Sequence, residues 1–244
     1  MTSPQQEALV IGLMSGTSLD GIDAAMIKAD PDEITTIHTL FTPFDSELRQ
    51  QLADLASATD WAPDYYHRIE HQLTRHYSTS IKALLQQANI NASDTTAIAC
   101  HGQTVRHRPD IDTPYTVQMV NGALLAELTG ITVVTDFRAR DMAAGGEGAP
   151  LAPGFHHHYF SPKFDSVAVV NIGGFANVTY WDKSDTLLGF DTGPGNVLMD
   201  AWMQDRFGKD FDSKGSICST GRPDQGLLAT MSQDSYFSEP APKS

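Results

Sequence analysis

The stretch from Gly12 to Asp23 constrains the fold of this chain more than any other part of its sequence. It reads Gly-Leu-Met-Ser-Gly-Thr-Ser-Leu-Asp-Gly-Ile-Asp, with an apolar run before it (8–11) and another after it (24–27). Two apolar runs joined by a Gly, Ser, Thr and Asp turn predict a β-hairpin. Such a turn can direct the N–H groups of residues 16–18 and two hydroxyls toward an oxyanion such as phosphate. No Gly-Lys-Ser/Thr follows, so it is not a Walker loop. An ordinary tight hairpin is the alternative, and the turn alone favours it.

The composition excludes some classes of binding partner and indicates a cellular compartment. The chain has 30 acidic and 16 basic residues and a net charge of −14, which argues against nucleic acid and against an anionic membrane as partner. An anionic ligand such as ATP would need backbone amides, a few basic side chains and a divalent cation. Two cysteines, a polar start and no apolar run of about 18 residues predict a cytoplasmic protein without a transmembrane helix.

Periodicity and turn residues predict alternating strands and helices, which is typical of an α/β protein. Asp45 or Ser46 caps the first predicted helix, and Asn121 caps another that Gly130 ends. The apolar stripe of the long helix that Pro63 opens is expected to lie in the core. Expected strands cover 8–11, 24–27, 34–41, 96–100, 115–119, 131–135, 166–172, 178–181 and 187–190, and expected helices cover 46–56, 63–89, 121–129, 151–160, 197–207 and 225–231.

Polar residues follow two of the predicted strands in the first half. His101-Gly-Gln-Thr-Val-Arg-His107 comes after strand 96–100, and Asp136-Phe-Arg-Ala-Arg-Asp141 comes after strand 131–135. Open α/β sheets place their ligand sites just beyond strand ends. The alternative is that His101 caps the strand and Arg106 is a solvated charge. A Gly-rich segment at 143–153 can approach a ligand closely, whereas the three consecutive histidines at 156–158 point in different directions and cannot share one metal.

The second half repeats the opening element. Strand 166–172 runs into Gly173-Gly-Phe-Ala-Asn177 and a further strand, which predicts a second hairpin with a glycine turn. Asp191-Thr-Gly-Pro-Gly-Asn196 then lies between a strand and a helix, a place suited to phosphate or metal-bound phosphate. One such hairpin in each half is the arrangement expected when two related α/β halves hold a nucleotide between them.

Six motifs together resemble the 1,6-anhydro-N-acetylmuramic acid kinase family of the sugar kinase/actin/Hsp70 superfamily. They are the segments 12–23, 101–107, 136–141, 145–151, 171–177 and 189–196. The resemblance implies an α/β, actin-like and ribonuclease H-like ATPase fold with a complete first half and an incomplete second half. It implies a first domain at 1–160, with the phosphate-binding hairpin and the sugar-site residues, and the start of a second domain at 161–244.

The resemblance also implies a reaction. ATP, with Mg²⁺, would phosphorylate O6 of 1,6-anhydro-N-acetylmuramic acid while water opens the anhydro bridge, giving N-acetylmuramic acid 6-phosphate in peptidoglycan recycling. Asp141 would be the general base, with Asp136 as second choice, and Asp20 and Asp191 would hold Mg²⁺ through water. Arg106, His101 and Gln103 would contact the sugar. Nucleotide contacts would come from Gly16, Thr17, Ser18, Leu19, Asp20, Gly21, Ile22, Asp23, Gly173, Gly174 and Asn177.

Family members continue beyond Ser244, so the resemblance identifies the chain as a truncated member. The second sheet is then expected to have an unprotected edge and an uncovered apolar face, with poor solubility or dependence on a partner. A catalytically inactive nucleotide- or sugar-binding remnant is the alternative function. An acetate-kinase-like enzyme or a glycosidase is a third, with acids drawn from Asp136, Asp141 and Glu147, but it leaves both hairpins without a role. The expected partner is a small molecule, and a homodimer is left open.

Overall fold

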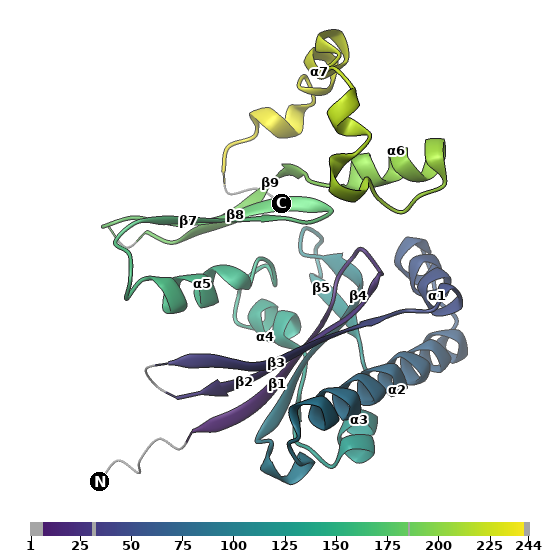
Figure 1. Cartoon of the computed structure of the whole chain (residues 1–244), viewed down its shortest axis with the longest axis vertical. Coiled ribbons are helices and arrows are strands. Elements are labelled where there is room, and N and C mark those ends of the chain that lie inside the picture. The colour runs from purple at the N-terminus through teal and green to yellow at the C-terminus, as the bar shows by residue number, and fades with distance from the viewer. Residues whose placement is uncertain (1–6, 31–32, 185, 242–244) are drawn as a thin grey trace. The chain divides into compact units, whose positions relative to one another are not determined.

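The N-terminal motif forms the hairpin that the sequence predicts. Strands β1 (Ala8–Ser15) and β2 (Gly21–Ala29) pair antiparallel, with Met14 opposite Asp23 at the end of the ladder. Strand β3 (Ile34–Pro43) continues the antiparallel sheet beside β2, and β4 (Ala97–Arg108) pairs parallel with β1 (Figure 1). The motif therefore lies at the centre of the sheet and not at its edge.

The computed structural model describes residues 7–30, 33–184 and 186–241. It divides into two units, Met1–Ala149 and Pro150–Ser244. The sequence placed the domain boundary after residue 160, behind helix α5 (Ala152–Phe160). In the structure α5 packs on strands of the second unit and is grouped with them.

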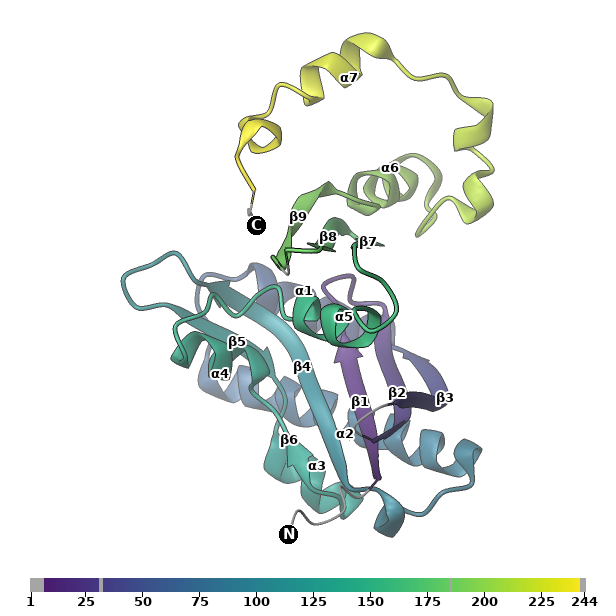
Figure 2. The same cartoon turned by 90° about the vertical axis from the view of Figure 1, so that its left-hand side faces the viewer.

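The sheet of the first unit has the order β3-β2-β1-β4-β5, with β5 (Tyr115–Met119) antiparallel to β4. The short β6 (Val133–Val134) pairs parallel with the first part of β4. Figure 2 shows β4 as a long strand that passes beside β1 and then beside β5. An antiparallel meander followed by parallel strands, with helices between them, is the α/β, actin-like and ribonuclease H-like fold, and the predicted fold class is confirmed.

Helices α1 (Ser46–Ser57), α2 (Pro63–Ala88) and α3 (Gly122–Thr129) belong to the same unit (Figure 1). Their ends follow the predicted signals. The carboxylate of Asp45 accepts the Leu48 amide, and the Asn121 side chain accepts the Leu124 amide. Gly130 ends α3 with a φ of 71°, a left-handed conformation that glycine adopts at little cost. A short 3₁₀ turn, η1 (Ala92–Asp94), precedes β4.

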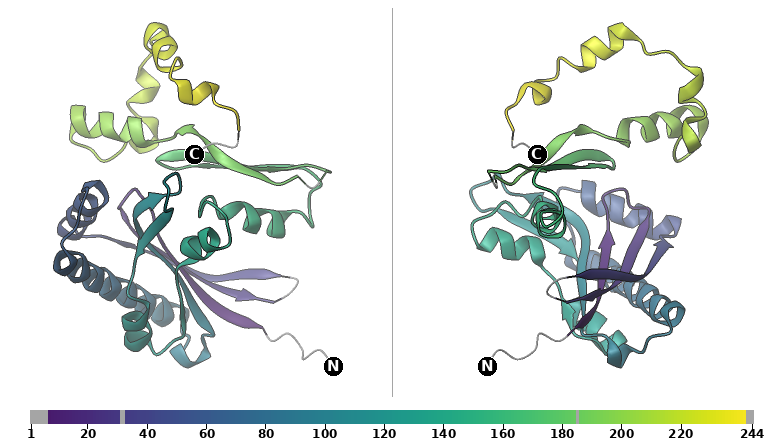
Figure 3. Two further views of the ribbon diagram at one scale, coloured as in Figure 1. Left: turned by 180° about the vertical axis from the view of Figure 1, so that it is seen from behind. Right: turned by 60° about the vertical axis from the view of Figure 1, so that its left-hand side comes forward.

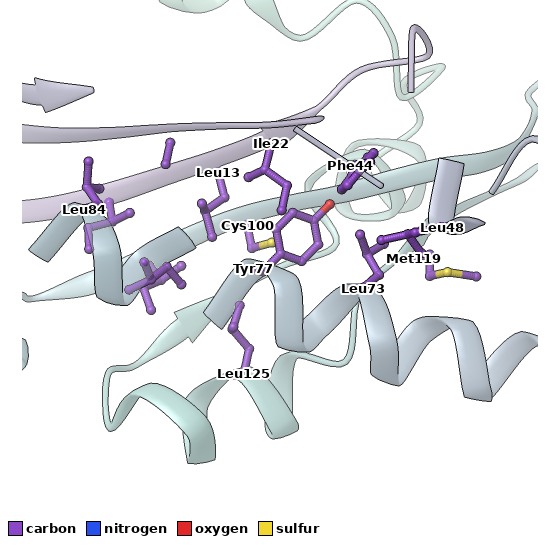
Figure 4. Close-up of a cluster of buried hydrophobic side chains, with 14 of the residues drawn as sticks. Leu13, Ile22, Phe44, Leu48, Leu73, Tyr77, Leu84, Cys100, Met119 and Leu125 are labelled. Carbon is purple, nitrogen blue, oxygen red and sulfur yellow. The ribbon is translucent and has the colours of Figure 1, made fainter. Parts of the chain in front are cut away.

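Helix α2 supplies much of the core with its apolar stripe. Tyr77 is fully buried in the centre of the stripe, near Leu13, Ile22 and Cys100 (Figure 4). Its hydroxyl lies 2.6 Å from Oγ of Ser15, at the last residue of β1. Burial raises the pKa of Tyr77 well above its usual range, and burial raises the pKa of Cys100 to about 12. The long helix is thus joined by a buried hydrogen bond to the strand that carries the N-terminal motif.

One prediction about a strand end in the first unit was wrong, and one predicted strand is shorter than expected. Residues 101–107 do not follow a strand; they continue β4, because the backbone bends at Gly102 (φ 76°) and pairs with β5. Residues 137–141 are helical as part of α4 (Phe137–Ala143), and the strand before them is reduced to two residues. Pairing with β5 and the onset of α4 are tertiary features that residue periodicity does not encode.

The second unit contains a separate antiparallel sheet, β7 (Val167–Ile172), β8 (Phe175–Trp181) and β9 (Leu188–Pro194) (Figure 3). The second hairpin is present as predicted. Strand β9 runs through Asp191 and Gly193, so the predicted turn beginning at Asp191 starts later, at Gly195. The remaining helices are α6 (Val197–Phe207) and α7 (Gln225–Met231), with 3₁₀ turns η2 (Ser213–Gly215), η3 (Cys218–Thr220) and η4 (Ser235–Ser238).

The second sheet exposes apolar side chains. Val170 and Ile172 on β7 are 59% and 64% exposed, and Phe175 on β8 is 57% exposed. Helix α6 adds Trp202, which is 58% exposed. In the described part of the chain β7 and β9 have no further strand beside them. The uncovered apolar face expected from the sequence is therefore observed. Among the same residues, no helix is long and apolar enough to cross a membrane.

Replacing Tyr77 with Phe is expected to destabilise the protein by about 1 kcal/mol, because Ser15 loses a buried hydrogen-bond partner while the ring remains in place. Urea unfolding measures the change. Tyr65→Phe on the same helix is the control, since the half-buried Tyr65 has no side-chain hydrogen bond within the described residues. Equal stability of Tyr77→Phe and wild type would contradict a structural role for the Ser15–Tyr77 bond.

Candidate functional site

The turn of the N-terminal hairpin leaves two backbone donors unused. Leu19 adopts a left-handed conformation (φ 54°), and its amide donates to the Gly16 carbonyl over 3.2 Å. The amides of Thr17 and Ser18 donate to no acceptor within the described residues. Free amides side by side in a turn with a left-handed residue suit an oxyanion. The geometry of the turn thus agrees with a phosphate site.

Neighbouring strands hold this turn in place. Nε2 of Gln103 on β4 donates to the Gly16 carbonyl over 3.1 Å, while Oε1 of Gln103 is buried without a partner in the described structure. At the other end of the turn, a Cβ on Gly21 would lie 2.4 Å from the Thr42 carbonyl oxygen and 2.8 Å from the Phe41 ring. Only glycine allows β2 to approach β3 this closely.

Two carboxylates accompany the turn. Oδ1 of Asp20 accepts the Ser18 hydroxyl over 2.6 Å, and the Asp20 side chain is exposed. Burial and the nearby charge of Asp20 raise the pKa of Asp23. The described residues contain no group of three or more His, Cys, Asp or Glu side chains that could hold a metal ion by themselves.

A second cluster joins three sequence motifs of the first unit. Nε of Arg138 on α4 donates to Nε2 of His101 over 2.8 Å, and Nη1 of Arg138 donates to the Gly148 carbonyl over 2.8 Å. The Gly148 amide in turn donates to Oδ2 of Asp141 over 2.8 Å. The segments 101–107, 136–141 and 145–151 thus meet at Arg138, which sequence reasoning did not select.

The Gly-rich segment packs against the Asp141 side chain. A Cβ on Gly146 would lie 2.2 Å from Oδ2 of Asp141, so a side chain at this position would displace the Asp141 carboxylate. The other carboxylate oxygen, Oδ1, has no hydrogen-bond partner in the described part of the chain. Asp141 is thus held through one oxygen and presents the other.

Asp136 occupies the N-cap position of α4 in a left-handed conformation (φ 63°). Its side chain forms no cap to the helix; Oδ2 instead accepts the Thr135 hydroxyl over 3.0 Å. The carboxylate of Asp136 is exposed and accessible. Asp136 stays a second candidate for an acid–base role.

Arg106 makes structural contacts. Its Nη2 donates to the Ala58 carbonyl at the end of α1, and its guanidinium lies 4.6 Å from the Trp61 ring centre. Nε of Arg106 is buried without a partner within the described structure. Most of the guanidinium is therefore engaged by the α1–α2 connection, and a sugar contact by Arg106 stays a prediction.

In the second unit, the glycine turn of the hairpin contacts the start of α6. The Gly195 and Asn196 amides donate to the carbonyls of Gly174 and Gly173 over 2.8 and 2.7 Å. A Cβ on Gly195 would lie 2.2 Å from the Gly173 carbonyl oxygen. The segments 171–177 and 189–196, predicted separately, therefore form one structure.

Polar residues align across this second sheet. Asn177 on β8 is the Cα partner of Asn171 on β7 and of Asp191 on β9, so the three side chains share a face. Burial raises the pKa of Asp191. Two of the consecutive histidines of α5 contact β8: Nδ1 of His156 lies 2.8 Å from the Thr179 hydroxyl, and the His157 and Trp181 rings pack in a T-shaped arrangement.

Replacing Gly195 with Ala is expected to destabilise the second unit by about 1–3 kcal/mol, because the new methyl group overlaps the Gly173 carbonyl. Hydrogen exchange at the Gly195 and Asn196 amides measures the loss of contact, because these amides donate to the Gly174 and Gly173 carbonyls. Gly174→Ala is the matched control, since its Cβ would meet only Val197 at an ordinary 3.9 Å. Similar exchange rates in both variants would contradict this account of the turn.

Comparison with known proteins agrees with these motifs. The family model of anhydro-N-acetylmuramic acid kinase matches residues 8–244. The enzyme of that name from Hahella chejuensis is 53% identical over 234 residues, which cover 96% of this chain and 64% of the relative. The one from Nitrosomonas europaea is 45% identical over 237 residues, covering 96% and 64%. The chain thus spans just under two thirds of the length of these curated relatives.

Among solved structures, an Aquifex aeolicus member of the Ppx/GppA family aligns over 83% of this chain and 55% of its own, with 10% identity and a TM-score of 0.39. The family assignment comes from sequence, over nearly the whole chain. The chain belongs to the anhydro-N-acetylmuramic acid kinase family.

Proposed function

We propose that this chain carries the kinase activity of its family: ATP-dependent phosphorylation of 1,6-anhydro-N-acetylmuramic acid at O6 with hydrolytic opening of the anhydro ring. The observation that carries the proposal is the state of Asp141, which is fixed through Oδ2 by the Gly148 amide while Oδ1 has no partner within the described residues. A carboxylate oriented in this way suits a general base. The product would be N-acetylmuramic acid 6-phosphate, an intermediate of peptidoglycan recycling.

The nucleotide phosphates would bind at the two hairpins. The free amides of Thr17 and Ser18 support this role for the first, and the glycine turn at Gly173 and Gly174 is the proposed counterpart in the second unit. Asp20 and Asp191 would hold Mg²⁺ through water, and their carboxylate oxygens are the ligands that this cation prefers. When bound, Mg²⁺ supplies charge that stabilises the transferring phosphoryl group.

Asp141 would take a proton from the water that attacks the anomeric carbon. The bond between this carbon and O6 of the anhydro bridge breaks with its electron pair on O6. O6 then accepts the γ-phosphoryl group of ATP, and the bond between that group and ADP breaks. The proton leaves the water as the bond to carbon forms, so the base must lie within hydrogen-bond reach of the water. Asp136 is the second choice, because its carboxylate is exposed but bonded only to the neighbouring Thr135 hydroxyl.

The sugar would be contacted by Gln103, His101 and Arg106. Gln103 is the best supported of the three, because its Oε1 is buried without a donor and could accept a sugar hydroxyl proton. Both ring nitrogens of His101 already have protein partners, and two sides of the Arg106 guanidinium are engaged. These two residues would therefore contact the sugar only with their remaining surface.

Purified protein with ATP, Mg²⁺ and 1,6-anhydro-N-acetylmuramic acid is expected to release ADP only when the sugar is present. A coupled assay for ADP, with the sugar phosphate identified by mass spectrometry, measures this reaction. Calorimetry on the same preparation separates binding from turnover. Sugar binding without ADP release would show a non-catalytic binding protein of the same fold and would exclude the kinase proposal for this chain.

Asp141→Asn is expected to abolish turnover, because the amide cannot take a proton from water. Its remaining oxygen can still accept the Gly148 amide, so sugar binding measured by calorimetry should change little. Asp136→Asn is the matched variant and should retain most of the activity. Full activity in Asp141→Asn, or complete loss in Asp136→Asn alone, would transfer the role of the base to Asp136.

A further inference from the structure

We propose that Arg138 is a positioning residue of this reaction: one guanidinium fixes the His101 ring and the Gly148 peptide, and through Gly148 the Asp141 carboxylate. The inference rests on the proposed function for its kinetic consequence. Its structural consequences are the tautomer of His101 and the hydrogen bonds of the Gly148 peptide, and both apply to the protein without ligands.

Arg138 donates hydrogen bonds to two different segments. Nε reaches His101 on β4 and Nη1 reaches the Gly148 carbonyl in the Gly-rich segment, each over 2.8 Å. A guanidinium has its donors in a rigid plane, whereas a lysine ammonium is a single point on a flexible stem. One arginine can therefore set the separation of two segments that are distant in the sequence, and lysine cannot replace it.

Both backbone polar groups of Gly148 form hydrogen bonds. Its carbonyl accepts from Arg138 and its amide donates to Asp141, with a φ of 77° that favours glycine. Arg138 and Asp141 also lie on the same short helix. The contacts thus form a closed ring of helix, guanidinium, Gly148 and carboxylate, so the orientation of Asp141 depends on the Arg138 bond.

The Arg138 bond also selects the tautomer of His101. A guanidinium remains protonated in proteins, so Nε must donate and Nε2 of His101 must accept. The proton of the neutral ring then lies on Nδ1, which donates to the Gly102 carbonyl over 2.8 Å. Burial lowers the pKa of His101, the Gly102 bond opposes this, and the charge of Arg138 lowers the pKa further. The ring is thereby kept neutral, with Nδ1 protonated.

The first test uses ¹⁵N NMR of histidine side chains in the full chain without ligands. His101→Asn identifies the His101 signals by their loss. In wild type, Nδ1 of His101 should carry the proton and Nε2 should show the signature of an unprotonated nitrogen. In Arg138→Lys the ring should become a mixture of tautomers. A proton on Nε2 in wild type, or an unchanged ring in Arg138→Lys, would overturn the proposal.

The second test is kinetic. Arg138→Lys should lower kcat by about 100-fold, the size of effect expected when a catalytic group is displaced by about 1 Å. KM for ATP should stay within about 2-fold, because Arg138 does not contact the phosphate-binding hairpin. Arg140→Lys is the matched control on the same helix, since Arg140 is exposed, and it should keep wild-type kcat.

The outcomes separate the positioning role from a merely structural one. A lower melting temperature with unchanged kcat in Arg138→Lys would overturn the proposal, as would an equal loss of kcat in Arg140→Lys. Arg138→Gln serves as a second variant if the lysine variant does not fold. If wild type shows no sugar-dependent ADP release, the proposed function fails, while the NMR experiment still decides whether Arg138 sets the state of His101.

Discussion

The buried hydrogen bond between Tyr77 and Ser15 connects the largest helix of the first unit to the strand that carries its phosphate-type turn. Ser15 is the last residue of β1, and its hydroxyl lies 2.6 Å from the Tyr77 hydroxyl and 3.4 Å from the Gly102 carbonyl. Both residues are buried, and among the described residues the Tyr77 hydroxyl bonds Ser15 while the Ser15 hydroxyl bonds both Tyr77 and the Gly102 carbonyl. The burial of α2 therefore also fixes the point where β1 ends and the turn begins, and it fixes the bend of β4 at Gly102.

Close approaches at glycine positions shape the sequence motifs within each unit. Gly21, Gly146 and Gly195 each occupy a position where a Cβ would overlap an oxygen atom. In each case the oxygen belongs to a segment that must lie against the motif: β3, the Asp141 carboxylate, or the second glycine turn. The absence of a side chain is therefore a packing requirement at these positions, and it explains why glycines recur in the motifs.

Local features were predictable from the sequence, and tertiary ones were not. Both hairpins, the caps at Asp45 and Asn121 and the αL stop at Gly130 were predicted, because each depends on neighbours within a few residues. The extension of β4 through residues 101–107 depends on pairing with β5, which lies later in the chain. The sequence placed the right motifs in the right order, but it could not show that three of them meet at Arg138.

The two arginines in these motifs illustrate the limit most clearly. Arg106 and Arg138 each follow a predicted strand and each lie among polar residues, so sequence pattern does not separate them. In the structure, Arg106 is occupied by the Ala58 carbonyl and the Trp61 ring, away from Asp141. Arg138 instead bonds His101 and Gly148, and Gly148 in turn bonds Asp141. A cation that bonds the hydrogen-bond partner of the proposed base, Asp141, can control the orientation of that carboxylate, whereas one held by a helix end stabilises the fold. The partners of each guanidinium, and not its position in a motif, therefore decide its role.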